Sequence, residues 1–386
     1  MRNKICSLEI LRSIAFICVI LHHTGIKTLK LGAGGVSIFL IMSGFILIIG
    51  YFPGDRIREV SFKQNIRFSY SKVNRLYMLH VLCTFAMMLF AFIGTEKLDI
   101  KEVILKLTSN LFLVQEWIPM SDSILNRSIN PVSWYLCTAV FTWFIFPYVV
   151  SVMKKAYNVK KALFALVALY MLQILIGILC YEVNGVFQIS DVGMDMIGWV
   201  CYTHPLVRAI DFLIGCNLGY IFLNMRLDNK KEIKFYTTFE IIAIVLFAFS
   251  NIVYIIKRYD VDVSYVMNID SSRWWTYSII FTPVTCMLIL VFAIGKGKLT
   301  KILVENKWLL YIAKISSYGF LIHYVVFRYI SVILWHIPRI GGELFAKRYG
   351  GIINCTIGVS VTFFLCKLWI SFRKKIDFQN LSEKTI

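Results

Sequence analysis

The first apolar stretch of the chain, residues 7–25, carries a cation and a histidine at the spacing of one helix face. Arg12 and His23 are eleven positions apart; over that length an α-helix turns through about 1100°, roughly 20° beyond three full turns. The two side chains therefore share a face, about 16 Å apart along the helix axis. A guanidinium binds phosphates and carboxylates, and a histidine titrating near neutral pH is a common general base. The pair predicts a polar strip that serves binding or proton transfer.

A purely structural role for the two side chains is the alternative. An ionisable group at membrane depth costs a few kcal/mol and usually faces a bundle interior or a watered cavity. Arg12 can instead extend its head group to the near interface, and His23 can meet lipid head groups at the far end. This stretch alone leaves both interpretations open.

The other apolar stretches are the elements that must position this strip. Hydrophobic residues make up 58% of the 386 residues and charged residues only 16%, and the mean hydropathy of +0.71 excludes an ordinary soluble domain. A helix needs about 20 apolar residues to cross a bilayer. The sequence predicts an all-α, polytopic membrane helix bundle of about ten transmembrane helices, at residues 7–25, 34–52, 74–94, 132–152, 161–181, 205–225, 236–256, 275–295, 309–336 and 351–371.

Lysine and arginine residues gather in alternate connections between these stretches. The segments on the side of the termini include the clusters at 56–75 and 154–161, whereas residues 182–204 contain no lysine or arginine. By the positive-inside rule both termini are cytoplasmic, and residues 376–386 form a cytoplasmic tail. We expect a multi-pass protein of a bacterial plasma membrane, whose net charge of +19 reflects the membrane surface and not a nucleic-acid partner.

The ten cysteines occur one at a time, mostly within apolar segments. They form no C-x-x-C pair and have no His-rich spacing, so we expect them to pack as small apolar side chains. We expect no metal site.

Two further stretches hold side chains that suit packing or anion binding. Ser43-Gly44 lies in the middle of the second span, where small residues permit close helix contact. Lys72 and Arg75 lie at the start of the third span. Cations there either bind phosphates or only satisfy the topology rule.

These pieces form an ordered series along the chain. It opens with Leu8, Glu9, Arg12 and His23, continues with Gly35, Val36, Phe39, Ser43, Gly44 and Phe45, and then with Asn130, Trp134, Leu136 and Pro147. It ends with Pro205, Arg208, Asp211, Phe212 and Gly215, followed by Ser316, Ser317, Tyr318, Leu321 and His323. In order and spacing the series resembles the signatures of the acyltransferase 3 family of integral-membrane acyltransferases. The resemblance covers the whole chain and marks residues 1–375 as an acyltransferase-3-like transmembrane domain.

The chain departs from the family pattern in three places. Ala139 stands where many members have a glutamate, and Glu116 is a weak candidate replacement. Lys72 and Arg75 stand where the family has three arginines. We expect the chain to lack the extracytoplasmic esterase-like domain of many members, so that transfer is direct or a separate extracytoplasmic transferase completes it.

The resemblance implies an O-acyltransferase that moves acetyl from cytoplasmic acetyl-CoA to a hydroxyl of a cell-surface or lipid-linked glycan. Arg12, Lys72 and Arg75 would bind the donor, and His23 with Arg12 would be catalytic, His23 as a base or as a covalent acyl carrier. Further residues have either a site role or a structural role: Glu9, Ser43, Trp134, Arg208, Asp211 and His323. Arg208 and Asp211 are three apart and can pair within the membrane.

Two other functions are compatible with a polar strip inside a bundle. A transporter or flippase for a polar or glycan substrate uses the same kind of strip without acyl chemistry. A scaffold that has lost catalysis would explain Ala139 and the reduced basic motif. Acyl transfer from labelled acetyl-CoA separates the enzyme from both.

Overall fold

The structure is a computed structural model that describes residues 2–26, 29–53, 60–93, 100–118, 128–187, 198–225, 232–258, 278–336 and 342–382. Within these ranges every regular element is helical. The α-helices are α1 (Arg2–His23), α2 (Gly32–Tyr51), α3 (Phe62–Ile93), α4 (Ile100–Leu111), α5 (Trp134–Ala156), α6 (Val159–Phe187), α8 (Pro205–Leu223), α9 (Ile233–Arg258), α10 (Thr282–Ile294), α11 (Lys298–Val304), α12 (Lys307–Trp335), α13 (Gly342–Ile353) and α14 (Val359–Ser382). Short 3-10 turns η2 (Gln115–Trp117) and η3 (Pro131–Ser133) and π-helical turns η5 (Trp199–Thr203) and η8 (Asn354–Gly358) complete the set.

The described part of the chain confirms a polytopic helical bundle. Eight helical stretches are long and apolar enough to cross a membrane: 6–23, 32–51, 131–156, 159–183, 199–223, 233–256, 307–335 and 342–375. Each overlaps one of the predicted spans. The predicted span at 275–295 is represented by the shorter apolar helix α10, and the one at 74–94 falls within α3, which begins earlier, at Phe62. The total of ten spans and the cytoplasmic termini stay predictions, as does the tail boundary, across which α14 continues to Ser382.

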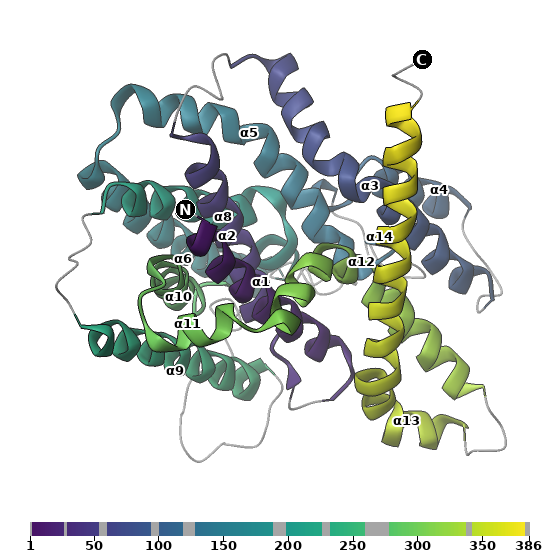
Figure 1. Cartoon of the computed structure of the whole chain (residues 1–386). Coiled ribbons are helices and arrows are strands. Elements are labelled where there is room, and N and C mark those ends of the chain that lie inside the picture. Colours follow the sequence, from purple (N-terminus) through teal and green to yellow (C-terminus); the bar gives the residue numbers. More distant parts are fainter. Residues whose placement is uncertain are drawn as a thin grey trace.

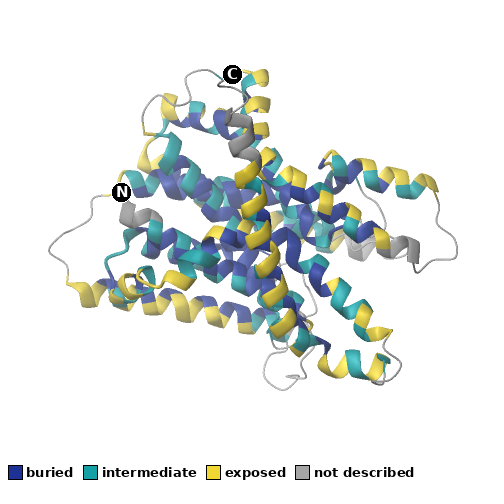
Figure 2. Ribbon diagram, turned by 45° about the vertical axis from the view of Figure 1, so that its right-hand side comes forward, coloured by how far each residue is buried: buried dark blue, intermediate teal, exposed yellow. Residues whose placement is uncertain are grey.

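Helices α1 and α2 lie at the centre of the bundle, and α9 and α14 lie on opposite sides of it (Figure 1). One apolar core joins α1 and α2 to α8, α9 and α10, and a second joins them to α3, α12 and α14. The outer helices α6, α9 and α14 expose large apolar side chains on the faces that point away from these cores (Figure 2). Exposed apolar faces of this kind suit contact with lipid tails.

The contact between α2 and α8 explains the small residue in the middle of the second span. A Cβ on Gly44 would overlap the carbonyl oxygen of Phe212, and a Cβ on Gly215 would overlap that of Ile41. The two backbones therefore touch, as in small-residue helix crossings of membrane proteins. This crossing holds Ser43 at the neighbouring face of α2.

The amphipathic segment between α3 and η3 descends into the bundle. The Tyr77 hydroxyl donates to the carbonyl of Leu111 over 2.9 Å, and the His80 Nε2 lies 2.9 Å from the carbonyl oxygen of Asn110. Because Tyr77 and His80 lie near the middle of α3, the end of α4 reaches the same depth. The end of α4 is therefore packed against α3 inside the bundle.

Candidate functional site

A cavity of about 280 Å³ lies between α1, α2, α3, α5 and α12. Three cations line it: Arg12 from α1, and Lys72 and Arg75 from α3. Ser43 of α2 and Ser316 of α12 add hydroxyl groups. The cavity thus brings together side chains that are far apart along the chain, and its cations suit a multiply charged anion.

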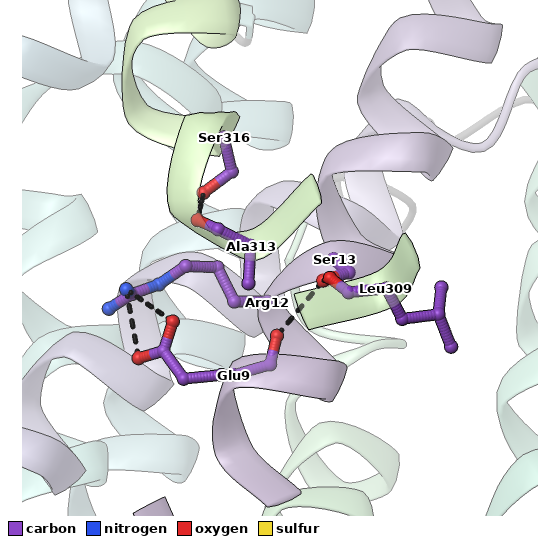
Figure 3. Close-up of polar contacts among 6 residues, drawn as sticks. All are labelled: Glu9, Arg12, Ser13, Leu309, Ala313 and Ser316. Atoms are coloured by element: carbon purple, nitrogen blue, oxygen red, sulfur yellow. Dashed lines mark hydrogen bonds and ion pairs between the residues drawn. The ribbon is translucent and has the colours of Figure 1, made fainter. Parts of the chain in front are cut away.

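Arg12 is held by a carboxylate from its own helix. Its Nη1 lies 3.1 Å from both Oε1 and Oε2 of Glu9, three residues earlier (Figure 3). The Ser13 hydroxyl lies 3.1 Å from the Glu9 carbonyl oxygen and 2.5 Å from that of Leu309 in α12. This contact joins α1 to α12 beside the cavity. Because the Glu9 carboxylate contacts only Nη1 of the guanidinium, Glu9 orients Arg12 and leaves its other donors for a ligand.

Lys72 is held at the cavity wall by aromatic side chains. Its Nζ donates to the Tyr51 hydroxyl over 2.7 Å and lies 4.8 Å from the centre of the Tyr51 ring and 5.1 Å from that of Phe68. Arg75 lies three residues later on α3, so both cations face the cavity from adjacent turns. Cation–π contacts of this type keep a lysine in place while leaving its ammonium charge uncompensated.

His23 lies outside this cavity, where α1 meets α12. Its Nδ1 lies 2.9 Å from the Val19 carbonyl oxygen and 3.1 Å from Nε2 of His323. The Nδ1 of His323 lies 2.9 Å from the Gly319 carbonyl oxygen. Since a carbonyl only accepts, both Nδ1 atoms carry the proton in the neutral rings, and His323 Nε2 accepts from His23. His23 Nε2 then holds a lone pair, as a base or nucleophile requires.

The neighbouring His22 has a different environment. Its ring packs where a Cβ on Gly32 would lie, at the start of α2, and its carbonyl oxygen accepts from the Lys30 ammonium over 3.2 Å. Burial lowers the pKa of Lys30, which lies beyond the end of α1. His22 therefore packs against α2, and His23 is the one that contacts His323.

Arg208 and Asp211 form the ion pair that their spacing predicts. Arg208 Nη1 lies 2.8 Å from Asp211 Oδ2, and both side chains are fully buried. The other Asp211 oxygen accepts from Gln173 Nε2 over 2.7 Å and lies 3.4 Å from the Thr282 hydroxyl. Neither member of the pair lines the cavity, which favours a structural role within α8.

Trp134 connects this ion pair to the aromatic side chains around the cavity. The Arg208 guanidinium lies 5.9 Å from the Trp134 ring and 5.6 Å from the Tyr202 ring. Trp134 also contacts Tyr202, with ring centres 5.0 Å apart. The guanidinium is therefore stacked among aromatic rings.

Neither Ala139 nor its weak candidate replacement, Glu116, lines the cavity. Glu116 is buried in η2 and accepts a 2.8 Å hydrogen bond from the Ser128 hydroxyl. Arg12 lines the cavity and Glu9 pairs with it without lining the cavity itself, and the wall contributed by α5 is aromatic and apolar.

Several cavity residues were not singled out from the sequence as members of the site. Tyr135, Trp143 and Phe320 all line it. Tyr135 directly follows Trp134, and Phe320 directly precedes Leu321 of the last motif. Their closeness to motif residues was the available sequence signal, but a pattern of apolar residues cannot tell a cavity wall from a lipid-facing side.

Among the residues described, no group of three or more His, Cys, Asp or Glu side chains is placed to bind a metal ion. The charged residues that line the cavity are instead the cations Arg12, Lys72 and Arg75, and Glu9 pairs with the first of them. Such a set suits phosphate binding.

One family model, for an acyltransferase domain of the acyltransferase 3 type, matches residues 6–369. The match covers most of α1, all of the residues that line the cavity and the first part of α14. Neither the curated proteins nor the solved structures include a match to the chain.

Proposed function

Since the chain belongs to the acyltransferase 3 family of integral-membrane acyltransferases, we propose that it moves an acetyl group from cytoplasmic acetyl-CoA to a hydroxyl of a cell-surface or lipid-linked glycan. The observation that carries the proposal is the cavity in which Arg12, Lys72 and Arg75 converge, beside the helix that bears His23. We place the protein in a bacterial plasma membrane. With the topology that the positive-inside rule predicts, the cations of the cavity lie toward the cytoplasm, where the donor is made.

The cations of the cavity suit the phosphate groups of the donor. Arg12 has a planar fork that binds phosphate in a bidentate manner, and Lys72 adds a point charge fixed by Tyr51. A volume of about 280 Å³ is near the lower limit for ligand pockets. It fits the narrow thioester arm better than the whole nucleotide, which would lie at the mouth.

His23 acts as the general base in this proposal. Its Nε2 takes the proton from the acceptor hydroxyl while the hydroxyl oxygen attacks the acyl carbonyl carbon. The carbon–sulfur bond breaks, and His23 returns the proton to the thiolate that leaves. The Val19 carbonyl oxygen sets the required tautomer by accepting from His23 Nδ1, and His323 Nε2 adds a second acceptor that helps to orient the ring.

A covalent role of His23 is the alternative within the same function. His23 Nε2 would then attack the acyl carbon itself, release the thiol and hand the acyl group to the acceptor in a second step. Acid quench of protein incubated with labelled acetyl-CoA, followed by peptide mass measurement, separates the two. Label on the peptide that contains His23 supports the carrier, and unlabelled peptide supports the base.

The central experiment measures glycan O-acetylation in cells with and without the chain. Arg12→Ala and His23→Ala should abolish it while the protein still inserts in the membrane. Lys155→Ala and His336→Ala are matched controls, because both residues are exposed and lie away from the cavity. Normal acetylation in both site variants would refute the mechanism.

Purified protein tests the rival function and the need for a partner. Acceptor movement across a vesicle without loss of acetyl from labelled acetyl-CoA would indicate a transporter. Acetyl-CoA turnover without glycan product would instead point to a separate extracytoplasmic transferase as partner.

A further inference from the structure

Three aromatic rings meet at the inner end of the cavity, each from a different helix. They are Phe39 of α2, Tyr135 of α5 and Phe320 of α12, and all three line the cavity. The ring centres of Tyr135 and Phe320 are 5.2 Å apart, and that of Phe39 lies 6.1 Å from each of the other two. Phe39 meets both other rings edge-to-face, and the Tyr135 and Phe320 rings are tilted against each other. We call the three side chains the ring triad.

The ring triad lies between the cavity and His23. The Phe320 ring is 6.1 Å from the His323 ring, which is 5.0 Å from that of His23. Along α12, Ser316 lines the cavity, Phe320 follows one turn later, and His323 follows after three more residues. Arg12 and His23 are about 16 Å apart along α1. Phe320 therefore belongs both to the cavity wall and to the contacts that lead through His323 to His23.

The backbone that carries Phe320, one member of the ring triad, is held tightly. A Cβ on Gly319 would overlap the Phe16 ring of α1, so α12 and α1 are in close contact directly beside Phe320. Phe320 itself is buried. Opening between the rings must come from side-chain rotation, because the helices cannot separate without losing this contact.

We propose that the ring triad is a constriction that selects the acyl group by its width. The inference rests on the proposed function. The acyl group enters first and the thioester arm follows, so an unbranched acyl group needs an opening that passes the planar carbonyl group and the arm behind it. An acyl group branched next to the carbonyl needs a wider opening between Phe39, Tyr135 and Phe320. The constriction therefore admits acetyl and excludes isobutyryl.

The test compares transfer from isobutyryl-CoA and acetyl-CoA by the purified full-length protein in nanodiscs. Phe320→Ala should raise the isobutyryl-to-acetyl rate ratio at least about tenfold, within the range by which small apolar groups are discriminated in pockets. Phe327→Ala is the matched control. Phe327 is buried in the same helix, and its ring lies 5.7 Å from that of His323, but it does not line the cavity. Its ratio should stay within about twofold of the wild type, which is less than one methylene contributes.

Milder variants keep the test valid if Phe320→Ala does not fold. Phe320→Leu and Phe39→Leu retain apolar volume and should raise the ratio about threefold, since only part of each ring is removed. A ratio equal to that of the wild type in every folded variant of the ring triad overturns the inference, as does an equal rise in Phe327→Ala. Absence of acetyl transfer by the wild type would instead refute the proposed function itself.

Discussion

Replacement of His323 by leucine distinguishes the role of His23, the proposed base, from that of His323, which positions it. The substitution removes the Nε2 that lies 3.1 Å from His23 Nδ1, while the Val19 carbonyl oxygen, 2.9 Å away, still accepts from the same atom. His23 thus keeps its tautomer and loses one of two acceptors. A typical net hydrogen bond contributes about 0.5–1.5 kcal/mol. At about 1.36 kcal/mol for each factor of ten, the turnover should fall about 2- to 13-fold.

His23→Ala should lower the turnover much more than His323→Leu does, because it removes the lone pair that takes the proton. General-base catalysis typically contributes about 10²- to 10⁴-fold. The assay is single-turnover transfer from labelled acetyl-CoA by purified protein in nanodiscs, with retained CoA binding as the check on folding. His336→Leu is the control, because His336 is exposed and lies just beyond the end of α12, the helix that carries His323.

Equal losses in His323→Leu and His23→Ala would refute this assignment of roles. So large an effect of His323 would mean that His323 itself moves the proton. An unchanged rate in His323→Leu would show that the contact between the two rings has no part in the reaction.

Three other substitutions test the packing and the charges. Gly44→Ala should destabilise the protein by about 1–3 kcal/mol, because its Cβ meets the α8 backbone; Gly50→Ala, whose Cβ meets nothing within 4 Å, should be silent in the same thermal unfolding assay. Arg208→Met should lower the free energy of unfolding by about 3–5 kcal/mol, because it leaves the buried Asp211 without its cation. In chemical unfolding, the double variant with Asp211→Leu should recover most of this loss. Absence of recovery would contradict a structural role of the pair. Lys72→Met should weaken CoA binding about tenfold or more in titration calorimetry, as expected for a lost hydrogen bond to a charged group, and an unchanged affinity would remove Lys72 from the donor site.

The fold class followed from local properties of the chain. Apolar stretches of about 20 residues define membrane helices because the bilayer core has a fixed thickness. Departures arose where the pattern was weak. Thus α10 is a short apolar helix within a longer predicted span, and α3 extends into the basic segment before its apolar part.

The cations of the site were also recognisable in the sequence. Arg12 stood out as a cation within an apolar stretch, Lys72 and Arg75 through the resemblance to the acyltransferase 3 family, and the cavity brings the three together. The aromatic residues Tyr135 and Phe320 did not stand out, because 15% of the chain is aromatic and most of those side chains serve packing or lipid contact.

The sequence by itself determined the helical membrane class, the approximate spans and the polar strip of the first helix, since each depends on neighbours within a few turns. Only the tertiary structure decided that His23 meets His323, 300 positions away. Only the crossing of α2 and α8 showed why residue 44 must be small. Only the cavity lining showed which aromatic rings lie between helices α2, α5 and α12 beside the cations. Contacts between helices depend on how whole faces pack, and the period of one helix does not contain that information.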